Sequence, residues 1–168
     1  MQTTSQHYIP PLNFGMIEED LYRSGQPNEL NFPFLEKLGL RTVVFLAQEE
    51  PTPRFLNFLD DQEIQLHHLG LNTSSNAWDP ITEEVVLEAL ELILDPNNYP
   101  MMVMCGLGRH RTGTVTGCLR KLQKWNLTSI FEEYRRYAGP KVRVLNEQFI
   151  ELFDADLVRI PSPRPSWL

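Results

Sequence analysis

Apolar residues recur along this chain in short runs and in longer periodic stretches, and each pattern predicts a different element. Short apolar runs, some rich in β-branched residues, predict buried strands at residues 21–24, 41–47, 64–69 and 100–105. A helix capped by Asn28 or Asn31 is predicted to run to about Leu38, and a second follows the break at Pro51–Pro53 and runs to about Asp61. Further helices are predicted at residues 81–94, 110–125, 129–137 and 145–153, most clearly where apolar residues share one broad face, at 81–94. Because strands and helices alternate, the sequence predicts an α/β fold with a mainly parallel central sheet flanked by helices.

The length of 168 residues fits one domain that buries enough surface to fold without disulfides or a metal. We place this domain at residues 13–155. Residues 1–12 are expected to form a mobile arm, because Pro10-Pro11 precludes a regular element. Residues 156–168 contain several prolines and are expected to form a loosely held tail.

Two features of the sequence indicate the cellular compartment. No apolar run approaches the roughly 18 residues that a membrane span needs, and the N-terminus lacks the apolar stretch of a secretory signal. The two cysteines, Cys105 and Cys118, form no CxxC pair and are expected to be free thiols. We therefore expect a cytoplasmic protein.

Charge is distributed unevenly along the chain. The net charge of −7 argues against nucleic acid or an anionic membrane as a general partner. Residues 109–143 nevertheless carry nine lysines and arginines and only two acidic residues. A solvated helix face would explain any single member of this stretch. The excess as a whole indicates a local positive field, which suits an anionic small molecule or a phosphorylated peptide.

The segment from Cys105 to Gly113 carries the clearest chemistry. Cys105 follows a predicted strand, Arg111 lies near the start of a predicted helix, and Gly106 and Gly108 lie between them. The glycines permit the unusual dihedrals with which a short loop turns its N–H groups inward around a phosphate. The N-terminus of the helix and the planar fork of Arg111 would bind the same phosphate.

A cysteine in such a cradle would act as a nucleophile. A free thiol is only a few per cent thiolate at pH 7, and the inward amides, the helix N-terminus and Arg111 all favour the thiolate. Cys105 would attack phosphorus, Arg111 would stabilise the equatorial oxygens, and water would hydrolyse the phosphocysteine. Thr112 would hydrogen-bond the sulfur as it leaves. No metal or other cofactor is expected.

The remaining residues of the loop would complete the phosphate-binding cradle. Leu107 and Arg109 lie within it, and His110 is expected to add positive charge.

A buried structural thiol is the alternative interpretation of both cysteines. We favour that packing role for Cys118, which lies in the middle of a predicted helix, over a role as redox partner of Cys105.

The leaving oxygen needs a general acid from another part of the chain. Our candidate is Asp79, in Trp78-Asp79-Pro80 just before a predicted helix. As an alternative, Asp79 would cap the N-terminus of that helix. Glu83 and Glu84 are further candidates, although their positions suit first-turn charges that stabilise the helix dipole.

Several strings of residues are typical of one family. They are Asn13–Met16, Leu21–Pro27, Phe34–Leu40, Gly108–Gly113, Gly117–Lys121, Phe131–Tyr134 and Phe149–Phe153. With these strings the chain resembles the plant-and-fungi atypical dual-specificity phosphatases, over about residues 12–155. Within that family it is most similar to the fungal oxidant-induced cell-cycle-arrest phosphatases, a subgroup of tyrosine-protein phosphatases.

The resemblance implies the compact cysteine-phosphatase fold, with Cys105 as nucleophile and Arg111 as phosphate binder, in a cytoplasmic protein. It implies phosphotyrosine-type or inositol pyrophosphate substrates and, for the subgroup, a role in oxidative-stress response and cell-cycle arrest. Lys141 and Arg143 lie where the family carries basic residues, and they are expected to meet a densely charged ligand. The implied partners are phosphorylated small molecules or phosphoproteins, and related phosphatase-like subunits.

One position departs from the pattern of the family. The family usually has histidine directly before the nucleophile, where this chain has Met104. Because that histidine helps to orient the loop, two hypotheses compete: an active phosphatase, and a weakly active phosphatase-like subunit that binds phosphorylated ligands or partner proteins. A sulfur transferase or an arsenate-reductase-like enzyme would share the spacing of Cys105 and Arg111 but would leave the other strings unexplained.

Overall fold

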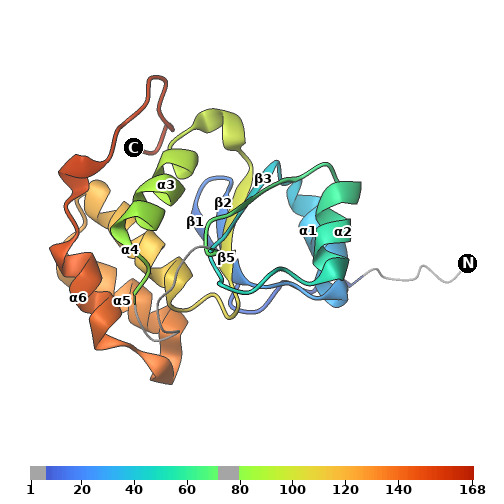
Figure 1. Ribbon diagram of the computed structural model, residues 1–168, viewed down its shortest axis with the longest axis horizontal. Helices are drawn as coiled ribbons and strands as arrows, with labels where there is room; N and C mark the ends of the chain where they lie inside the picture. The colour runs from blue at the N-terminus through green and yellow to red at the C-terminus, as the bar shows by residue number, and fades with distance from the viewer. Residues whose placement is uncertain (1–6, 72–79) are drawn as a thin grey trace, which may run out of the picture.

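The computed structural model describes residues 7–71 and 80–168, which contain a five-stranded sheet. The sheet lies at the centre of the molecule, between helices (Figure 1). The strand order is β1-β2-β5-β3-β4. Four strands run parallel to one another: β2 (Leu21–Gly25), β5 (Met101–Cys105), β3 (Thr42–Phe45) and β4 (Gln65–His68). At one edge, β1 (Gly15–Glu18) pairs antiparallel with β2. The predicted α/β fold with a mainly parallel sheet is therefore confirmed.

The edge strand β1 was not predicted from the sequence. It has four residues, of which only Ile17 is buried. A short edge strand that is mostly solvated shows neither a long apolar run nor a sustained alternation, so its sequence carries little signal. The four parallel strands lie at the predicted positions, because each of them has a run of apolar or alternating residues.

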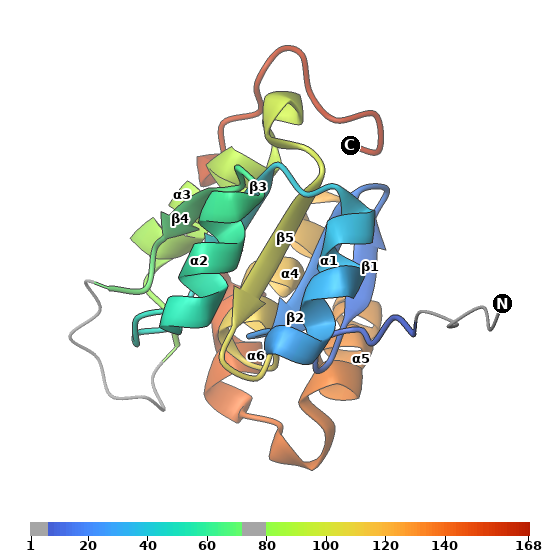
Figure 2. The ribbon, with the colours of Figure 1, turned by 90° about the vertical axis from the view of Figure 1, so that its right-hand side faces the viewer.

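The helices form one layer on each face of the sheet, as Figure 1 and Figure 2 show. One face is covered by α1 (Phe32–Leu38) and α2 (Pro53–Asp61). The other is covered by α3 (Glu83–Ile93), α4 (Arg111–Leu122), α5 (Leu127–Ala138) and α6 (Val144–Leu152). All six correspond to predicted helices. Within the two described ranges, no helix combines the length and the apolar character needed to cross a membrane.

A side-chain cap fixes the start of α3. Thr82 is the N-cap residue, and its hydroxyl accepts a hydrogen bond of 3.3 Å from the N–H of Val85. The alternative in which Asp79 caps this helix is therefore wrong, and Asp79 itself lies outside the described residues. Glu83 and Glu84 lie in the first turn of α3, where negative charge stabilises a helix.

The central strand β5 positions the cysteine. All five of its residues are buried, because it pairs with β2 on one side and with β3 on the other and lies between the two helix layers. The strand ends at Cys105. Its sulfur is therefore held at the carboxyl edge of the parallel strands, where ligands bind in sheets of this type.

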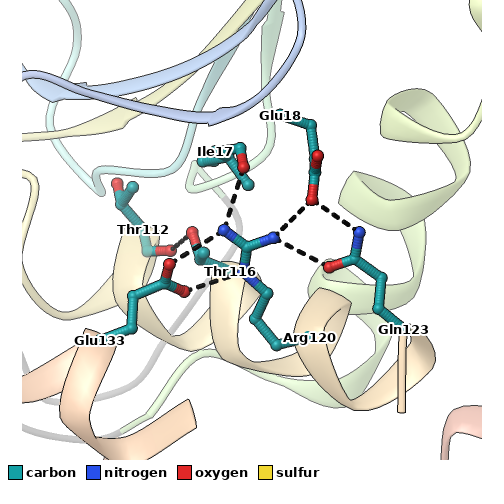
Figure 3. Close-up of polar contacts among 7 residues, drawn as sticks. All are labelled: Ile17, Glu18, Thr112, Thr116, Arg120, Gln123 and Glu133. Carbon is teal, nitrogen blue, oxygen red and sulfur yellow. Dashed lines mark hydrogen bonds and ion pairs between the residues drawn. The ribbon is translucent and has the colours of Figure 1, made fainter. Parts of the chain in front are cut away.

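A buried arginine connects three elements on one side of the sheet (Figure 3). Arg120, on α4, is 3% exposed and donates to both carboxylate oxygens of Glu133 on α5, at 3.0 and 2.9 Å. It also donates to Glu18 Oε1 at 2.8 Å and to the carbonyl of Ile17 at 3.0 Å, both in β1. This network fixes the helix that follows the cysteine loop against β1 and α5.

Parts of both terminal segments contact the domain. Pro11 is buried, and Asn31 Nδ2 donates to the carbonyl of Ile9 at 3.1 Å. Near the other end of the chain, Trp167 packs against the hydrophobic core. Tertiary contacts therefore reach into residues 7–12 of the predicted mobile arm and into the end of the predicted loose tail, whereas residues 1–6 of the arm lie outside the described residues.

Candidate active site

The loop between β5 and α4 lines a pocket of about 250 Å³. Its lining comes from the segment after β3, the loop itself and the turn before α6: Ala47, Gln48, Glu49, Cys105, Gly106, Leu107, Arg109, His110, Arg111 and Arg143. The structure thus gathers most of the predicted site residues around one cavity. Gly108 and Thr112 lie in the same segment of chain but are buried behind this lining.

The sulfur of Cys105 has a hydroxyl donor. Cys105 is 6% exposed, and Thr112 Oγ1 donates a hydrogen bond of 3.1 Å to its Sγ. Thr112 is completely buried in the first turn of α4, so the position of its hydroxyl is well defined. Met104, directly before Cys105, is also completely buried, and its thioether offers the sulfur no hydrogen-bond donor.

Donors from the N-terminal part of the chain hold the carbonyl groups of the loop. The N–H of Gln26 donates to the carbonyl of Gly106 at 3.0 Å. Asn13 Nδ2 donates to the carbonyls of Leu107 and Gly108, at 3.3 and 3.2 Å. Because a trans peptide points its C=O and N–H in opposite directions, these contacts turn three successive N–H groups to the other side of the loop.

Gly108 is the loop residue that requires glycine. Its φ is +71°, and a Cβ there would lie 2.6 Å from the backbone N of Gly25 in β2. Its carbonyl also accepts from Arg23 Nη2 at 3.1 Å. Gly106 has no positive φ, and a Cβ there would meet no atom of the described residues within 4 Å. The expectation that Gly106 supplies an unusual dihedral is therefore wrong.

Arg111 is the first residue of α4, and its side chain reaches the pocket. Nη1 donates to the carbonyl of Leu46 at 3.1 Å, which anchors the guanidinium just beyond the end of β3. Burial lowers the pKa of Arg111; Cys105 and Glu49 act in the opposite direction, and Arg143 adds to the lowering. Arginine titrates so far above neutral pH that the group stays charged.

His110 is neutral at physiological pH. Burial lowers its pKa to about 4, and the charges of Arg143 and Arg109 contribute to this lowering. The expectation that His110 adds positive charge to the loop is therefore wrong. The sequence could not reveal this, because the shift depends on burial and on a charge that comes from a distant part of the chain.

The hydroxyl of Tyr134 on α5 determines the tautomer of His110. It accepts from the N–H of Arg143 at 3.2 Å and from Asn146 Nδ2 at 3.1 Å. It also lies 2.9 Å from His110 Nδ1. Because both of its lone pairs are engaged, it donates its proton to Nδ1, and Nε2 of His110 carries the imidazole proton. One hydroxyl group thus connects the loop with α5 and the start of α6.

The predicted basic stretch contributes only some of its members to the pocket. Three of its arginines line the cavity: Arg109, Arg111 and Arg143. Arg120 is buried among its own partners, and Arg135 forms an ion pair of 2.7 Å with Glu147. Lys141 is exposed in the 3-10 turn Gly139–Lys141 and does not line the pocket. The positive field at the site therefore comes from few residues.

Some residues of the site were not predicted from the sequence. Gln48 and Glu49 line the pocket from the segment after β3, and no spacing rule relates them to the cysteine loop. Arg23 offered a signal, since it is a charged residue within a strand whose five residues are all buried. The candidate acid Asp79 lies outside the described residues, so its role stays a prediction.

Comparison with known proteins indicates one family. The tyrosine phosphatase family model matches residues 8–168. The chain is 67% identical over 162 residues to the probable tyrosine-protein phosphatase DG1060 of Dictyostelium discoideum, with 96% of this chain and 97% of that protein covered. It is 68% identical over 151 residues to OCA1 of Mycosarcoma maydis, with 89% and 96% covered.

Solved structures show the same similarity. The core catalytic domain of the PP-IP phosphatase SIW14 from S. cerevisiae, in complex with citrate, has a TM-score of 0.83 and 44% identity, with 90% of this chain and 91% of that chain covered. TpbA of P. aeruginosa in complex with pTyr shares the fold, with a TM-score of 0.69 and 19% identity. The predicted resemblance is thus confirmed: the chain belongs to the tyrosine phosphatase family, whose members hydrolyse phosphoric monoesters.

Proposed function

We propose that the chain is a metal-independent phosphatase that acts through a phosphocysteine on Cys105. The observation that carries this proposal is the common pocket of Cys105 and Arg111 at the N-terminus of α4. The Thr112 hydroxyl at 3.1 Å from the sulfur supports it. A helix N-terminus contributes about half a positive charge, and together with the guanidinium this favours the thiolate.

The proposed reaction has two steps. First, the sulfur of Cys105 attacks phosphorus in line, so that an S–P bond forms while the bond to the leaving oxygen breaks. Arg111 and the loop N–H groups stabilise the equatorial oxygens, and Asp79 is the proposed acid that protonates the leaving oxygen. Second, water cleaves the S–P bond and releases phosphate, while Thr112 stabilises the departing thiolate.

We infer that the substrate is a densely phosphorylated small molecule of the inositol pyrophosphate type. Arg109 and Arg143 line the pocket beside Arg111, which provides positive charge for phosphate groups other than the one that reacts. The similar core domain of SIW14 is that of a PP-IP phosphatase. A phosphotyrosine-type substrate is the alternative, and it presents a single phosphate. Lys141, exposed outside the pocket lining, stays a prediction as a substrate contact.

Competing substrates test this assignment. We expect a higher kcat/KM for a diphosphoinositol polyphosphate than for a phosphotyrosine peptide. Arg143→Gln should lower kcat/KM for the inositol substrate by about tenfold or more, because a hydrogen bond to a charged group contributes roughly 1.5–3 kcal/mol. The same substitution should lower kcat/KM for the phosphotyrosine peptide by a smaller factor. An equal loss for both substrates would contradict the assignment of Arg143 to additional phosphate groups.

Met104 favours a second candidate, a weakly active subunit that binds phosphorylated ligands or partner proteins. A completely buried thioether gives the neighbouring thiol no polar support. Release of p-nitrophenol from p-nitrophenyl phosphate by the wild type, compared with Cys105→Ser, separates the two candidates. Wild-type release no faster than that of the variant would favour the binding subunit.

The role in oxidative-stress response and cell-cycle arrest stays a prediction from the resemblance.

A further inference from the structure

Arg23 lies behind the cysteine loop, in the interior of the protein. It is 1% exposed on β2, and its Nη2 donates to the carbonyl of Gly108 at 3.1 Å. Its guanidinium carbon lies 3.6 Å from the centroid of the Tyr137 ring on α5. The side chain therefore fills the space between the loop and the helix layer, with its charged end against the outer side of the loop.

The surroundings of Arg23 differ from those of the other buried arginine. Arg120 donates to both oxygens of Glu133 and to further acceptors (Figure 3). Arg23 has no carboxylate partner among the described residues, and its Nε and Nη1 have no hydrogen-bond partner in the described part of the chain. A buried charge with such incomplete pairing destabilises the fold, so a structural role alone does not account for it.

The sheet register places Arg23 on the same face as the cysteine. Arg23 pairs with Val103 and Gly25 pairs with Cys105 in the parallel ladder between β2 and β5. Side chains two positions apart on a strand share a face, so Arg23 and Cys105 project to the side covered by α4 and α5. Burial lowers the pKa of Arg23 to about 10, whereas Tyr137, Glu133 and Cys105 act in the opposite direction, so Arg23 stays charged at neutral pH.

The hydrogen bond of Arg23 has a consequence on the other side of the loop. The carbonyl of Gly108 and the N–H of Arg109 belong to one peptide unit and point in opposite directions. Arg23 and Asn13 hold this carbonyl from behind, at 3.1 and 3.2 Å, and thereby fix the N–H of Arg109. The charge of Arg23 therefore lies on one side of this peptide, and the N–H of Arg109 points to the other side.

We propose that Arg23 is a positioning residue of the active site, which fixes the Gly108–Arg109 peptide and provides a second buried positive charge for the Cys105 thiolate and for bound phosphate. This proposal rests on the function proposed above. In the absence of an anion the charge of Arg23 is poorly compensated; the thiolate and a bound phosphate supply the missing negative charge. Arg111 binds the phosphate directly, whereas Arg23 acts through the backbone and through its field.

The test separates charge from hydrogen bonding. Arg23→Gln keeps a donor near Gly108 but removes the charge, and Arg23→Lys keeps the charge. Alkylation of Cys105 by iodoacetamide, followed by mass spectrometry of its peptide, reports the thiolate fraction as the ratio of rates at pH 6 and pH 9. We expect Arg23→Gln to lower this ratio by several fold, because loss of a nearby opposite charge disfavours the ionised form of the thiol. Arg23→Lys, which keeps the charge, should have an alkylation ratio closer to that of the wild type.

Protection by inorganic phosphate provides the second measurement. Phosphate in the pocket slows alkylation, and Arg23→Gln should raise the concentration needed for half-protection by several fold. Arg120→Gln and Arg120→Lys are the matched controls, because they change a buried arginine that does not contact the loop. They should lower the thermal midpoint while leaving the alkylation ratio and the phosphate requirement unchanged.

Two results would overturn the proposal: an alkylation ratio for Arg23→Gln equal to that of the wild type, or an equal loss in Arg120→Gln. If Arg23→Gln does not fold, Arg23→Lys decides, because lysine keeps the positive charge. An alkylation ratio close to that of the wild type is then the expected result. A ratio as low as that of Cys105 in the unfolded protein would contradict the role of charge. Absence of phosphatase turnover in the wild type would count against the proposed function alone, because alkylation and phosphate protection do not require turnover.

Discussion

The hydroxyl of Thr112 lies 3.1 Å from the sulfur of Cys105 and donates a hydrogen bond to it. The two residues are brought together by the loop that connects β5 to α4, and both are buried. A hydroxyl that donates to sulfur stabilises the thiolate, which is the attacking group in the first step and the leaving group in the second. The contact is therefore expected to matter for both steps of the proposed reaction.

Thr112→Val removes this donor while keeping the shape of the side chain. We expect kcat to fall by about ten- to a hundredfold, because a hydrogen bond to a charged group contributes roughly 1.5–3 kcal/mol. If breakdown of the phosphocysteine becomes the slow step, rapid-quench measurements will show a burst of the leaving alcohol. Thr112→Ser, which retains the hydroxyl, is the control. A kcat for Thr112→Val within twofold of the wild type would contradict the role of this contact.

Arg111→Lys tests the phosphate-binding fork. Lysine keeps the positive charge but cannot present two parallel N–H donors to the phosphate, and it also loses the contact with the Leu46 carbonyl. We expect kcat/KM for p-nitrophenyl phosphate to fall by more than about 10²-fold. Activity within a few-fold of the wild type would argue that the guanidinium does not bind the transferred phosphoryl group.

The general acid can be identified from its dependence on the leaving group. Asp79 is the predicted acid, and Glu49 is a second carboxylate that lines the pocket. Loss of the true acid should reduce kcat/KM by about 10²-fold or more for an alkyl phosphate and much less for p-nitrophenyl phosphate, whose leaving group needs no proton. We expect this pattern for Asp79→Asn and not for Glu49→Gln. The reverse pattern would assign the role to Glu49.

The titration of His110 links the site to the stability of the fold. Its pKa is about 4 in the folded protein and close to the ordinary 6.5 when unfolded, so the folded state favours the neutral imidazole. Its contribution to stability is therefore fully present above pH 6.5 and is lost as the pH falls toward 4. NMR titration of the His110 ring should give a midpoint near 4. In His110→Gln, the free energy of unfolding should fall less between pH 7 and pH 5 than in the wild type. A midpoint close to 6.5 would refute the neutral assignment.

Arg120→Met should destabilise the fold without disabling the chemistry. The substitution leaves the buried Glu133 carboxylate without its partner, which in comparable cases lowers the free energy of unfolding by about 3–5 kcal/mol. Urea unfolding measures this loss. The double variant Arg120→Met/Glu133→Leu should recover much of it, because it removes both members of the pair. A single variant as stable as the wild type would show that the network in Figure 3 contributes little.

The sequence by itself determined the parallel strands, the six helices and the chemistry of the cysteine loop. These features depend on neighbouring residues: the apolar run that ends at Cys105, the turn of the loop and the start of a helix at Arg111 all lie within one short segment. The short strand β1 was missed because its four residues carry too little pattern.

Only the tertiary structure decided which other residues surround that loop and in which charge state. Strand pairing places Arg23 behind Gly108, and the end of β3 brings Glu49 to the pocket. Burial and the charge of Arg143 make His110 neutral. Arg120 and Arg135 belong to the basic stretch of the sequence, but in the folded protein they form ion pairs with Glu133 and Glu147. Burial and electrostatic interaction depend on distance in space, and the spacing of residues along the chain does not determine that distance.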